Sequence, residues 1–584
     1  MRDPDENIRA KLRKYSPADE SYQHPFIRKY TMESPDVPRE LEEVFQNWTQ
    51  TNGVMIVAPT GAGKSTFVLS ILYPYVAEHG RRLLIVSNRT ALNSQYKNQL
   101  LRQLNSPALK KYTPIGIQEQ EEFEGVQATF CTYQGLPGLM KRLRCHEVGP
   151  FDFVVLDEAH WLVADSLFSE GSDYILEQIP RAFGKCVRVY MTATPWAVQN
   201  LIAKTEQVAP FPIAEGCYYL TTGAYQTRNP EFAVYQFPDF PRKYNLKFLP
   251  PSVRDDLCDE TLLSLITNSP NEEKWVIFSS SKELGRALAK ILPDAAYLDA
   301  DQKSGPLWNS LVEKSRFEKR VLITTAVIEN GLNINDSSVR HVVLLTTDHI
   351  QFIQELGRKR LRLGETLNVY VPNLSASQLH RLQMKNEQLY KLLQTFEKCL
   401  PEDLCNMRLD LWYHGTPEQR HLISMDGNGK LHVNQCAKQL ICQRQLFYSG
   451  LEDKQAQGVS HPFLRHVCRW LSLPDDIVLQ QDSWCCTTTE ERQQKFLEFL
   501  DGYLDVPISG KAEQNSFSEQ FRKLRVSAYG KRETGNARKD PWGIKILQDE
   551  LSHLKLPYCI EGNSKTWMLR RTETYERGNF DGNE

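Results

Sequence analysis

Short apolar runs rich in β-branched residues alternate with helix-like stretches over two parts of the chain, residues 53–195 and 274–374. Such alternation is typical of βα units around a parallel sheet that is covered on both faces. The first part predicts strands within residues 53–59, 81–88, 128–134, 151–159 and 187–195, and the second within residues 274–281, 295–301, 320–327, 339–347 and 366–374. The chain is therefore predicted to be an α/β protein with two parallel sheets in tandem.

The pattern changes after residue 374. Leucines recur at helical spacing behind Ser375 and Ser377, either of which could cap the helix, and a hairpin is expected to turn at residues 426–429. These signals predict an accessory region of a different structural class.

The last hundred residues carry a third pattern. A capping-box spacing from Thr488 to Glu491 predicts a helix. Further helices are expected around residues 517–526 and from Pro541 onward, followed by a hairpin that turns at residues 562–563. Helix, helix and hairpin together outline a winged helix.

These patterns divide the chain into six parts. We expect an amino-terminal extension in residues 1–39, a first α/β domain in 40–210, a connecting segment in 211–250, a second α/β domain in 251–374, a helical and hairpin accessory region in 375–487, and a basic winged-helix-like domain in 488–584.

Composition and charge exclude only a few classes of function. The 584 residues carry 70 Lys or Arg against 72 Asp or Glu, so any surface for a polyanion must be local. The charged amino terminus lacks the apolar stretch of a signal peptide, and no run approaches the length of a membrane span. We therefore expect a cytoplasmic protein without membrane contact. The 13 cysteines include no CxxC pair, which favours reduced thiols over a zinc site.

The first predicted strand leads into a glycine-rich turn and a helix, in the sequence GVMIVAPTGAGKST. Strand, loop and helix in this order are what a phosphate-binding loop requires. Gly61 and Gly63 would let backbone N–H groups surround a phosphate, Lys64 would place an ammonium on the β- and γ-phosphates, and Ser65 would offer a hydroxyl to Mg²⁺. Ala58 replaces the first glycine of the usual pattern. The predicted ATP contacts are Thr60, Gly61, Ala62, Gly63, Lys64, Ser65 and Thr66.

Two carboxylates follow another predicted strand, in FDFVVLDEAH. Side chains at the carboxyl ends of parallel strands face the ligand crevice of an open sheet. Asp157 would hold Mg²⁺, and Glu158 would orient and deprotonate the water that attacks the γ-phosphate. This pair predicts hydrolysis of ATP.

Five motifs occur in a recognisable order: APTGAGKST, DEAH at residues 157–160, TAT at 192–194, TTAVIENGLNIND at 324–336 and QELGRKR at 354–360. The chain thus resembles the DEAD/DEAH-box helicases of superfamily 2 over roughly residues 40–372, and its overall character is similar to helicases of bacterial mobile elements and phages. The resemblance implies two RecA-like domains with ATP between them, nucleic acid across both, and a monomer.

The same resemblance implies roles for further residues. Gln354 and Arg358 would reach the γ-phosphate from the second domain. The family's final arginine is replaced by Leu361, so that Arg360 is the favoured second arginine finger and Arg362 the alternative. His160, Thr192 and Thr194 would couple the nucleotide to domain closure, and Asp336 would lie near the ribose.

Nucleic-acid contacts are expected in two places. Hydroxyl and polar groups at strand ends could hold sugar-phosphate oxygens; these are Ser87, Asn88, Arg89, Thr132, Tyr133, Ser280, Thr324 and Thr325. Residues 511–571 hold 13 Lys or Arg against seven Asp or Glu, and Arg538, Lys539, Lys545, Lys565 and Arg570 could dock on phosphates. A solvated face for a protein partner is the alternative, and Trp567 could either pack in the core or stack on a base.

The sequence therefore predicts a helicase or translocase that uses ATP and Mg²⁺, with DNA favoured and RNA possible. One alternative is a duplex translocase that serves a separate nuclease or a replication or defence partner. A second is an ATP-switched DNA-binding protein.

Overall fold

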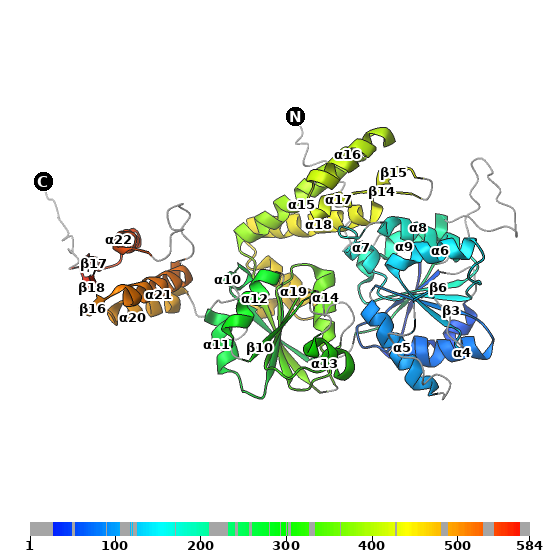
Figure 1. Cartoon of the computed structure of the whole chain (residues 1–584), viewed down its shortest axis with the longest axis horizontal. Helices are drawn as coiled ribbons and strands as arrows, with labels where there is room; N and C mark the ends of the chain where they lie inside the picture. Colours follow the sequence, from blue (N-terminus) through cyan, green and yellow to red (C-terminus); the bar gives the residue numbers. More distant parts are fainter. Residues whose placement is uncertain are drawn as a thin grey trace. The chain divides into compact units, whose positions relative to one another are not determined.

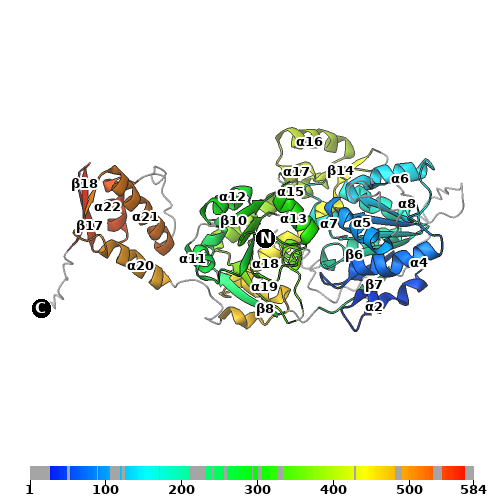
Figure 2. The same ribbon diagram turned by 60° about the horizontal axis from the view of Figure 1, so that its bottom comes forward.

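The computed structural model describes residues 27–48, 53–88, 90–105, 117, 119–120, 125–169, 171–208, 232–239, 243–255, 260–279, 281–292, 294–299, 301, 305–325, 333–362, 364–426, 429–479, 489–529, 542–563 and 565–572. The chain divides into two compact units, residues 1–484 and 485–584. Figures 1 and 2 show their elements from two directions. Each unit is described by itself.

The first domain is built on a seven-stranded parallel sheet with the order β1-β7-β2-β6-β5-β3-β4. Its strands are β1 (Ile27–Thr31), β2 (Gly53–Val57), β3 (Leu83–Ser87), β4 (Ala128–Thr132), β5 (Phe153–Leu156), β6 (Val187–Thr192) and β7 (Phe232–Gln236). Strands β2 to β6 confirm the five strands predicted here. Strands β2, β3 and β6 are buried along their whole length, because helices cover both faces of the sheet.

Helices close the two faces of this sheet (Figure 1). One face is covered by α2 (Val37–Leu41), α3 (Lys64–Phe67), α4 (Tyr73–Glu78) and α5 (Thr90–Leu104). The other is covered by α6 (Leu136–Arg144), α7 (Trp161–Ala164), α8 (Ser172–Ala182) and α9 (Gln199–Val208).

The second domain has a six-stranded parallel sheet with the order β10-β11-β9-β12-β13-β8. Its strands are β8 (Lys243–Leu249), β9 (Lys274–Phe278), β10 (Ala295–Leu298), β11 (Val321–Thr324), β12 (Val339–Leu344) and β13 (Thr366–Pro372), and β9 to β13 confirm the strands predicted there. Its helices are α10 (Ser252–Asp255), α11 (Glu260–Asn268), α12 (Lys282–Ile291), α13 (Pro306–Lys314) and α14 (His349–Arg358). The fold is thus α/β, with two RecA-like domains in tandem.

Three strands lie outside the expected domain boundaries. Strand β1 comes from the segment expected to be an extension, and β7 and β8 come from the segment expected to be a connection. Strand β1 is an edge strand whose residues are half-buried or exposed, so it lacks the continuous apolar run that identifies a buried strand. Strand β8 (KYNLKFL) is also an edge strand, and apolar and polar residues alternate along it. The search for continuous apolar runs therefore missed the edge strands β1 and β8.

The accessory region consists of α15 (Ala376–Phe396), α16 (Pro401–His414), α17 (Pro417–Arg420), the hairpin of β14 (Ile423–Met425) and β15 (Leu431–Val433), α18 (Gln435–Ala456) and α19 (Pro462–Trp470). Ser375 caps α15 in a capping box with Gln378, as its position predicts. Leu389 of α15 and Leu440 of α18 belong to the same apolar core as helices α6 to α9. Leu451 of α18 and Phe463 of α19 belong instead to the core of the second domain, so the accessory region packs on both domains.

The second unit contains α20 (Thr489–Asp501), β16 (Pro507–Ser509), α21 (Lys511–Tyr529), α22 (Ile544–His553), β17 (Tyr558–Gly562) and β18 (Thr566–Arg571), with the antiparallel order β16-β18-β17. Trp567 is 8% exposed and lies in the core, which excludes it as an exposed base-stacking side chain. Helix α22 begins at Ile544, after Gly543 in extended backbone, and not at Pro541 as expected. Pro541 and Thr488 lie outside the described residues.

Among the helices that the structure describes, not one combines the length and the apolar character needed to cross a bilayer.

Candidate functional site: a nucleotide cleft between the two domains

The phosphate-binding loop lies between β2 and α3. Gly61 has φ 89° and Gly63 φ 84°, a backbone conformation that other residues rarely adopt. A Cβ at Gly63 would lie 2.8 Å from Cδ of Pro38, so the loop also needs glycine there for space. The Val37 N–H donates to the Ala62 carbonyl at 3.0 Å, which ties α2 to the loop.

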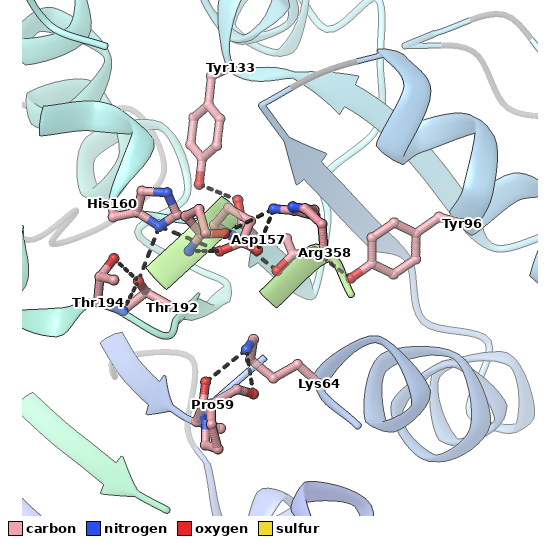
Figure 3. A network of polar contacts seen from close by, with 12 residues as sticks. Pro59, Lys64, Tyr96, Tyr133, Asp157, His160, Thr192, Thr194 and Arg358 are labelled. Carbon is pink, nitrogen blue, oxygen red and sulfur yellow. Dashed lines mark hydrogen bonds and ion pairs between the residues drawn. The ribbon is translucent and has the colours of Figure 1, made fainter. Parts of the chain in front are cut away.

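Lys64 begins α3 and is 8% exposed. Its ammonium donates to the carbonyl oxygens of Ala58 at 2.8 Å and Pro59 at 3.2 Å, and therefore lies over the loop (Figure 3). A cation held in this place, together with the backbone N–H groups at the start of a helix, suits an anionic phosphate chain.

Asp157 and Glu158 follow β5 at the carboxyl end of the sheet. The Tyr96 hydroxyl donates to Oδ2 of Asp157 at 2.8 Å, and the Glu158 N–H donates to Oδ1 at 3.0 Å (Figure 3). Burial and the neighbouring Glu158 carboxylate raise the pKa of Asp157 to about 6. Glu158 has a φ of 51°, a strained backbone for a residue with a side chain, and such strain is often found at functional sites.

The Glu158 carboxylate is only 13% exposed. Burial raises its pKa, whereas the basic side chains around it lower it by more, so the group ionises below its ordinary value; these side chains are His160, Lys64, Arg358 and Arg360. Glu158 is therefore a carboxylate at neutral pH.

A chain of polar contacts joins the DEAH and TAT motifs. Nδ1 of His160 lies 3.4 Å from Oε2 of Glu158 and 3.3 Å from Oγ1 of Thr192. Oγ1 of Thr192 in turn accepts from the Thr194 N–H at 2.9 Å (Figure 3). Burial lowers the pKa of His160, so the ring is neutral near pH 7 and one of its nitrogens can accept. The structure thus brings together the three residues expected to couple the site.

Helix α14 of the second domain reaches the same carboxylate. Nε2 of Gln354 lies 3.5 Å from Oε2 of Glu158, and Nη2 of Arg358 lies 4.0 Å from Oε1. Arg358 also donates to Oε1 of Gln354 at 2.9 Å. A Cβ at Gly357 would lie 2.6 Å from Oγ1 of Thr60, so the absence of a side chain lets α14 approach the phosphate-binding loop.

Residues of both domains line one cavity of about 200 Å³. Its lining includes the loop, both carboxylates and the two basic residues Arg358 and Arg360. Arg360 donates to Oδ1 of Asn333 at 2.9 Å, whereas Arg362 is exposed and does not belong to the lining. The oxygen donors of Ser65 and Asp157 are the kind that Mg²⁺ takes, and the cationic lining suits a triphosphate. The residues present therefore fit ATP and Mg²⁺.

Asp336 does not lie with these residues. Its Oδ2 accepts from the Lys274 ammonium at 2.9 Å, and its Oδ1 accepts from the Ser338 N–H at 3.0 Å. Lys274 opens β9, so this ion pair lies at the amino-terminal end of the strand, opposite the carboxyl ends that face the cavity. The expected ribose contact is not met, and Asn333 of the same turn lines the cavity instead.

Several expected nucleic-acid contacts are internal. Ser87 is fully buried and donates to Asn93, Thr324 is fully buried and donates to the Thr325 carbonyl, and Asn88 is also buried. The buried Tyr133 stacks on Trp161 and donates to the Asp157 carbonyl at 3.0 Å. These polar side chains serve the fold, because the strand ends of a sheet with helices on both faces are covered by their own connections.

The other expected contacts divide into three groups. Thr132 and Thr325 are half-buried, and Thr132 caps the turn at Gly135. Lys545, Lys565 and Arg570 are exposed on the second unit. Arg89, Ser280, Arg538 and Lys539 lie outside the described residues.

Helix α5 adds cavity residues that sequence reasoning missed. Leu92, Gln95, Tyr96 and Gln99 line the cavity with the loop and the DEAH residues. Their spacing of three, four and seven residues puts them on one helix face, and this was the signal that could have found them. Polar residues at this spacing are also typical of a solvent-exposed helix face. Only the packing of α5 against the loop shows that they line the cavity.

Fold and site together define a class: an α/β protein whose two RecA-like domains share one cavity. Residues 19–197 match the family model "Type III restriction enzyme, res subunit", which covers less than half of the chain. The amino-terminal domain is thus similar to that of restriction-enzyme res subunits. No curated protein matches the sequence.

Solved structures give distant matches. Dbp5 of S. cerevisiae, bound to RNA and ADP BeF3, is 16% identical with a TM-score of 0.39, over 57% of this chain and 83% of that one. The helicase Lhr of Mycobacterium smegmatis, bound to ssDNA and AMP-PNP, is 14% identical with a TM-score of 0.40, over 70% and 59%. A putative HsdR subunit of a type I restriction enzyme from Vibrio vulnificus is 17% identical with a TM-score of 0.37, over 58% and 63%. None of these bears on the resemblance to mobile-element and phage helicases, which stays a prediction.

Proposed function

We propose that this protein is a nucleic-acid-dependent ATP hydrolase that uses Mg²⁺ and couples hydrolysis to movement along, or unwinding of, DNA or RNA. The observation that carries the proposal is the shared cavity, in which Glu158 of one domain lies 4.0 Å from Arg358 of the other. A site that needs both domains makes hydrolysis depend on their closure, and closure is the movement that a translocase uses.

In this proposal each residue has a distinct task. Lys64 and the loop N–H groups would bind the phosphates, and Ser65 and Asp157 would hold Mg²⁺, whose charge would offset that of the phosphates. Glu158 orients the attacking water and takes its proton, while Arg358 and Arg360 stabilise the transition-state charge, a contribution worth about 10³–10⁵ in rate in other phosphoryl-transfer enzymes. Gln354 contacts both Glu158 and Arg358. His160 would couple the presence of the γ-phosphate to the positions of Thr192 and Thr194 through its contact with Thr192.

The second unit is proposed to bind nucleic acid as a winged helix. Its order of elements, helix, strand, two helices and a hairpin, supports this interpretation. The exposed Lys545, Lys565 and Arg570 would then contact phosphates, which positions the protein without reading sequence. DNA is favoured because such a module suits a duplex.

A second candidate is a duplex translocase within a restriction or nuclease complex. The match of residues 19–197 to a restriction-enzyme res subunit favours it. In this case a separate partner would cut the DNA.

The test is the ATPase rate of a Glu158→Gln variant with single-stranded DNA, duplex DNA or RNA present. Loss of the general base should lower kcat by about 10²–10⁴ while fluorescent ATP analogues still bind. Glu78→Gln is the matched control, because Glu78 is exposed at the end of α4 in the same domain. Full activity in Glu158→Gln would overturn its assignment as the base.

Strand displacement decides between the two candidates. Wild-type protein that hydrolyses ATP with duplex DNA but displaces no strand of either polarity would favour the duplex translocase. In that case, displacement of the third strand from a DNA triplex would report movement along the duplex without unwinding.

A further inference from the structure

The hydroxyl of Tyr96 contacts the carboxylate of Asp157, one of the two residues that would hold the cation. Tyr96 belongs to α5, is 1% exposed, and donates to Oδ2 of Asp157 at 2.8 Å (Figure 3). The phenol hydroxyl of α5 therefore holds one oxygen of the carboxylate that would meet a divalent cation.

This hydrogen bond fixes the orientation of the Asp157 carboxylate. The other oxygen, Oδ1, accepts from the Glu158 N–H at 3.0 Å. With one donor on each oxygen, the carboxylate plane cannot rotate without breaking one of the two bonds. Tyr96 supplies the only one of these two donors that is a side chain, so it can be removed without altering the backbone.

Tyr133 provides a natural comparison. It is also fully buried, and its hydroxyl also bonds to Asp157, at 3.0 Å, but the acceptor is the backbone carbonyl and not the carboxylate. Two tyrosines of equal size thus contact the same residue, one at the group that would meet a cation and one at the main chain. Figure 3 shows Tyr133 above Asp157 and Tyr96 to its right.

We propose that Tyr96 is a positioning residue that holds the Asp157 carboxylate ready to receive the divalent cation of a bound nucleotide. The proposal rests on the proposed ATPase function. It assigns to α5 a role in cation binding that the loop and the DEAH motif do not supply. Groups that orient metal ligands in this way are typically worth about 10–100-fold in metal affinity.

The experiment measures cation affinity without turnover. Mn²⁺ is titrated into the full chain with saturating ADP, and free Mn²⁺ is followed by electron paramagnetic resonance, for wild type, Tyr96→Phe and Tyr133→Phe. Tyr96→Phe should bind Mn²⁺ about tenfold more weakly while ADP binding in EDTA stays at the wild-type level. Tyr133→Phe should retain wild-type Mn²⁺ affinity. Equal Mn²⁺ affinity in Tyr96→Phe and wild type would overturn the proposal.

A double-mutant cycle separates positioning from loss of folding. If Tyr96 acts through the Asp157 carboxylate, Asp157→Ala and the Asp157→Ala, Tyr96→Phe double variant should bind Mn²⁺ equally, because the carboxylate that Tyr96 orients is already absent. Additive losses would contradict the proposal and indicate a general loss of structure. Wild-type protein that binds no ADP would instead refute the ATPase function, so the two failures are distinguishable.

Discussion

The two sides of the cavity between the RecA-like domains are held in different ways. On the first domain, Asp157 is fixed by hydrogen bonds from Tyr96 and the adjacent backbone, all within that domain. On the second domain, Gln354 and Arg358 lie at the end of α14, whose first turn is held by contacts that reach outside the domain. One side is therefore built into its own fold, and the other depends on its neighbours.

The contacts at the start of α14 join three parts of the first unit. The His349 ring stacks between Trp196, which follows the TAT motif, and Trp470 of α19, with centroids 4.1 and 4.5 Å apart. Burial lowers the pKa of His349 to about 3, so the ring is neutral and can stack on two indoles. Arg444 of α18 pairs with the capping Asp348 at 3.1 Å.

The accessory region thus contacts both sides of the cavity. Besides Arg444, α18 contributes Gln443, whose side-chain amide donates to the Trp196 carbonyl at 2.8 Å. The comparison teaches that the carboxylate side is preorganised, whereas the position of the arginine side is set partly by helices that follow both domains in sequence. Variants on the two sides should therefore fail differently.

The largest effect is expected from Arg358→Ala. Removing the guanidinium that faces Glu158 should lower kcat about 10³-fold or more while ATP binding changes little, because the charge it stabilises develops in the transition state. Single-turnover ATPase and nucleotide binding measure the two quantities. Arg362→Ala is the control, since Arg362 is exposed and outside the cavity lining. An equal loss in Arg362→Ala would reverse the preference for Arg360 as the second finger.

A smaller loss is expected from Gly357→Ala, which tests how closely the two sides must approach. The added Cβ would meet the Thr60 side chain, including its Cβ at 2.9 Å, so no rotamer of Thr60 relieves the clash. A displacement of α14 of about 1 Å should lower kcat about 10²-fold. Gly450→Ala in α18 is the matched control, because nothing lies within 4 Å of the added Cβ there. Normal ATPase in Gly357→Ala would show that hydrolysis does not need this approach.

The carboxylate side of the cavity was largely predictable and the arginine side only in part. Lys64, Asp157 and His160 each follow a buried strand in a local pattern, so chemistry and position could be inferred together. The contribution of Tyr96 could not, because it depends on which helix face meets the loop. Nor could the stack at His349, whose partners lie 153 and 121 residues away in sequence and meet only through the packing of α19. The nucleic-acid contact expected of Tyr133 has a different physical obstacle. A hydroxyl at a strand end is buried once the connection that follows the strand covers it.

Trp470→Ala should disturb the position of α14, and with it Arg358, without changing the carboxylate side of the cavity. Loss of one aromatic partner worth about 0.5–1.5 kcal/mol would let α14 leave its position, and kcat should fall by up to about tenfold with KM for ATP nearly unchanged. Trp470→Phe should restore most of the rate. A lower melting temperature with an unchanged kcat would mean that the stack supports the fold without positioning the helix.

The smallest effect concerns the hairpin of the accessory region, which docks on the first domain through His432 and the buried Asp173, 3.0 Å apart. The hydrogen bond to Asp173 raises the pKa of His432. A raised pKa means that the stabilising contribution is fully present below the unfolded value of about 6.5 and is lost as the pH rises through the folded value. The free energy of unfolding of wild type should therefore exceed that of His432→Gln by more at pH 6 than at pH 8.5, and the two differences should themselves differ by at most about 1 kcal/mol. Thermal melts of both proteins at the two pH values measure this. A difference that is the same at both pH values would show that the ring docks by packing and not by charge.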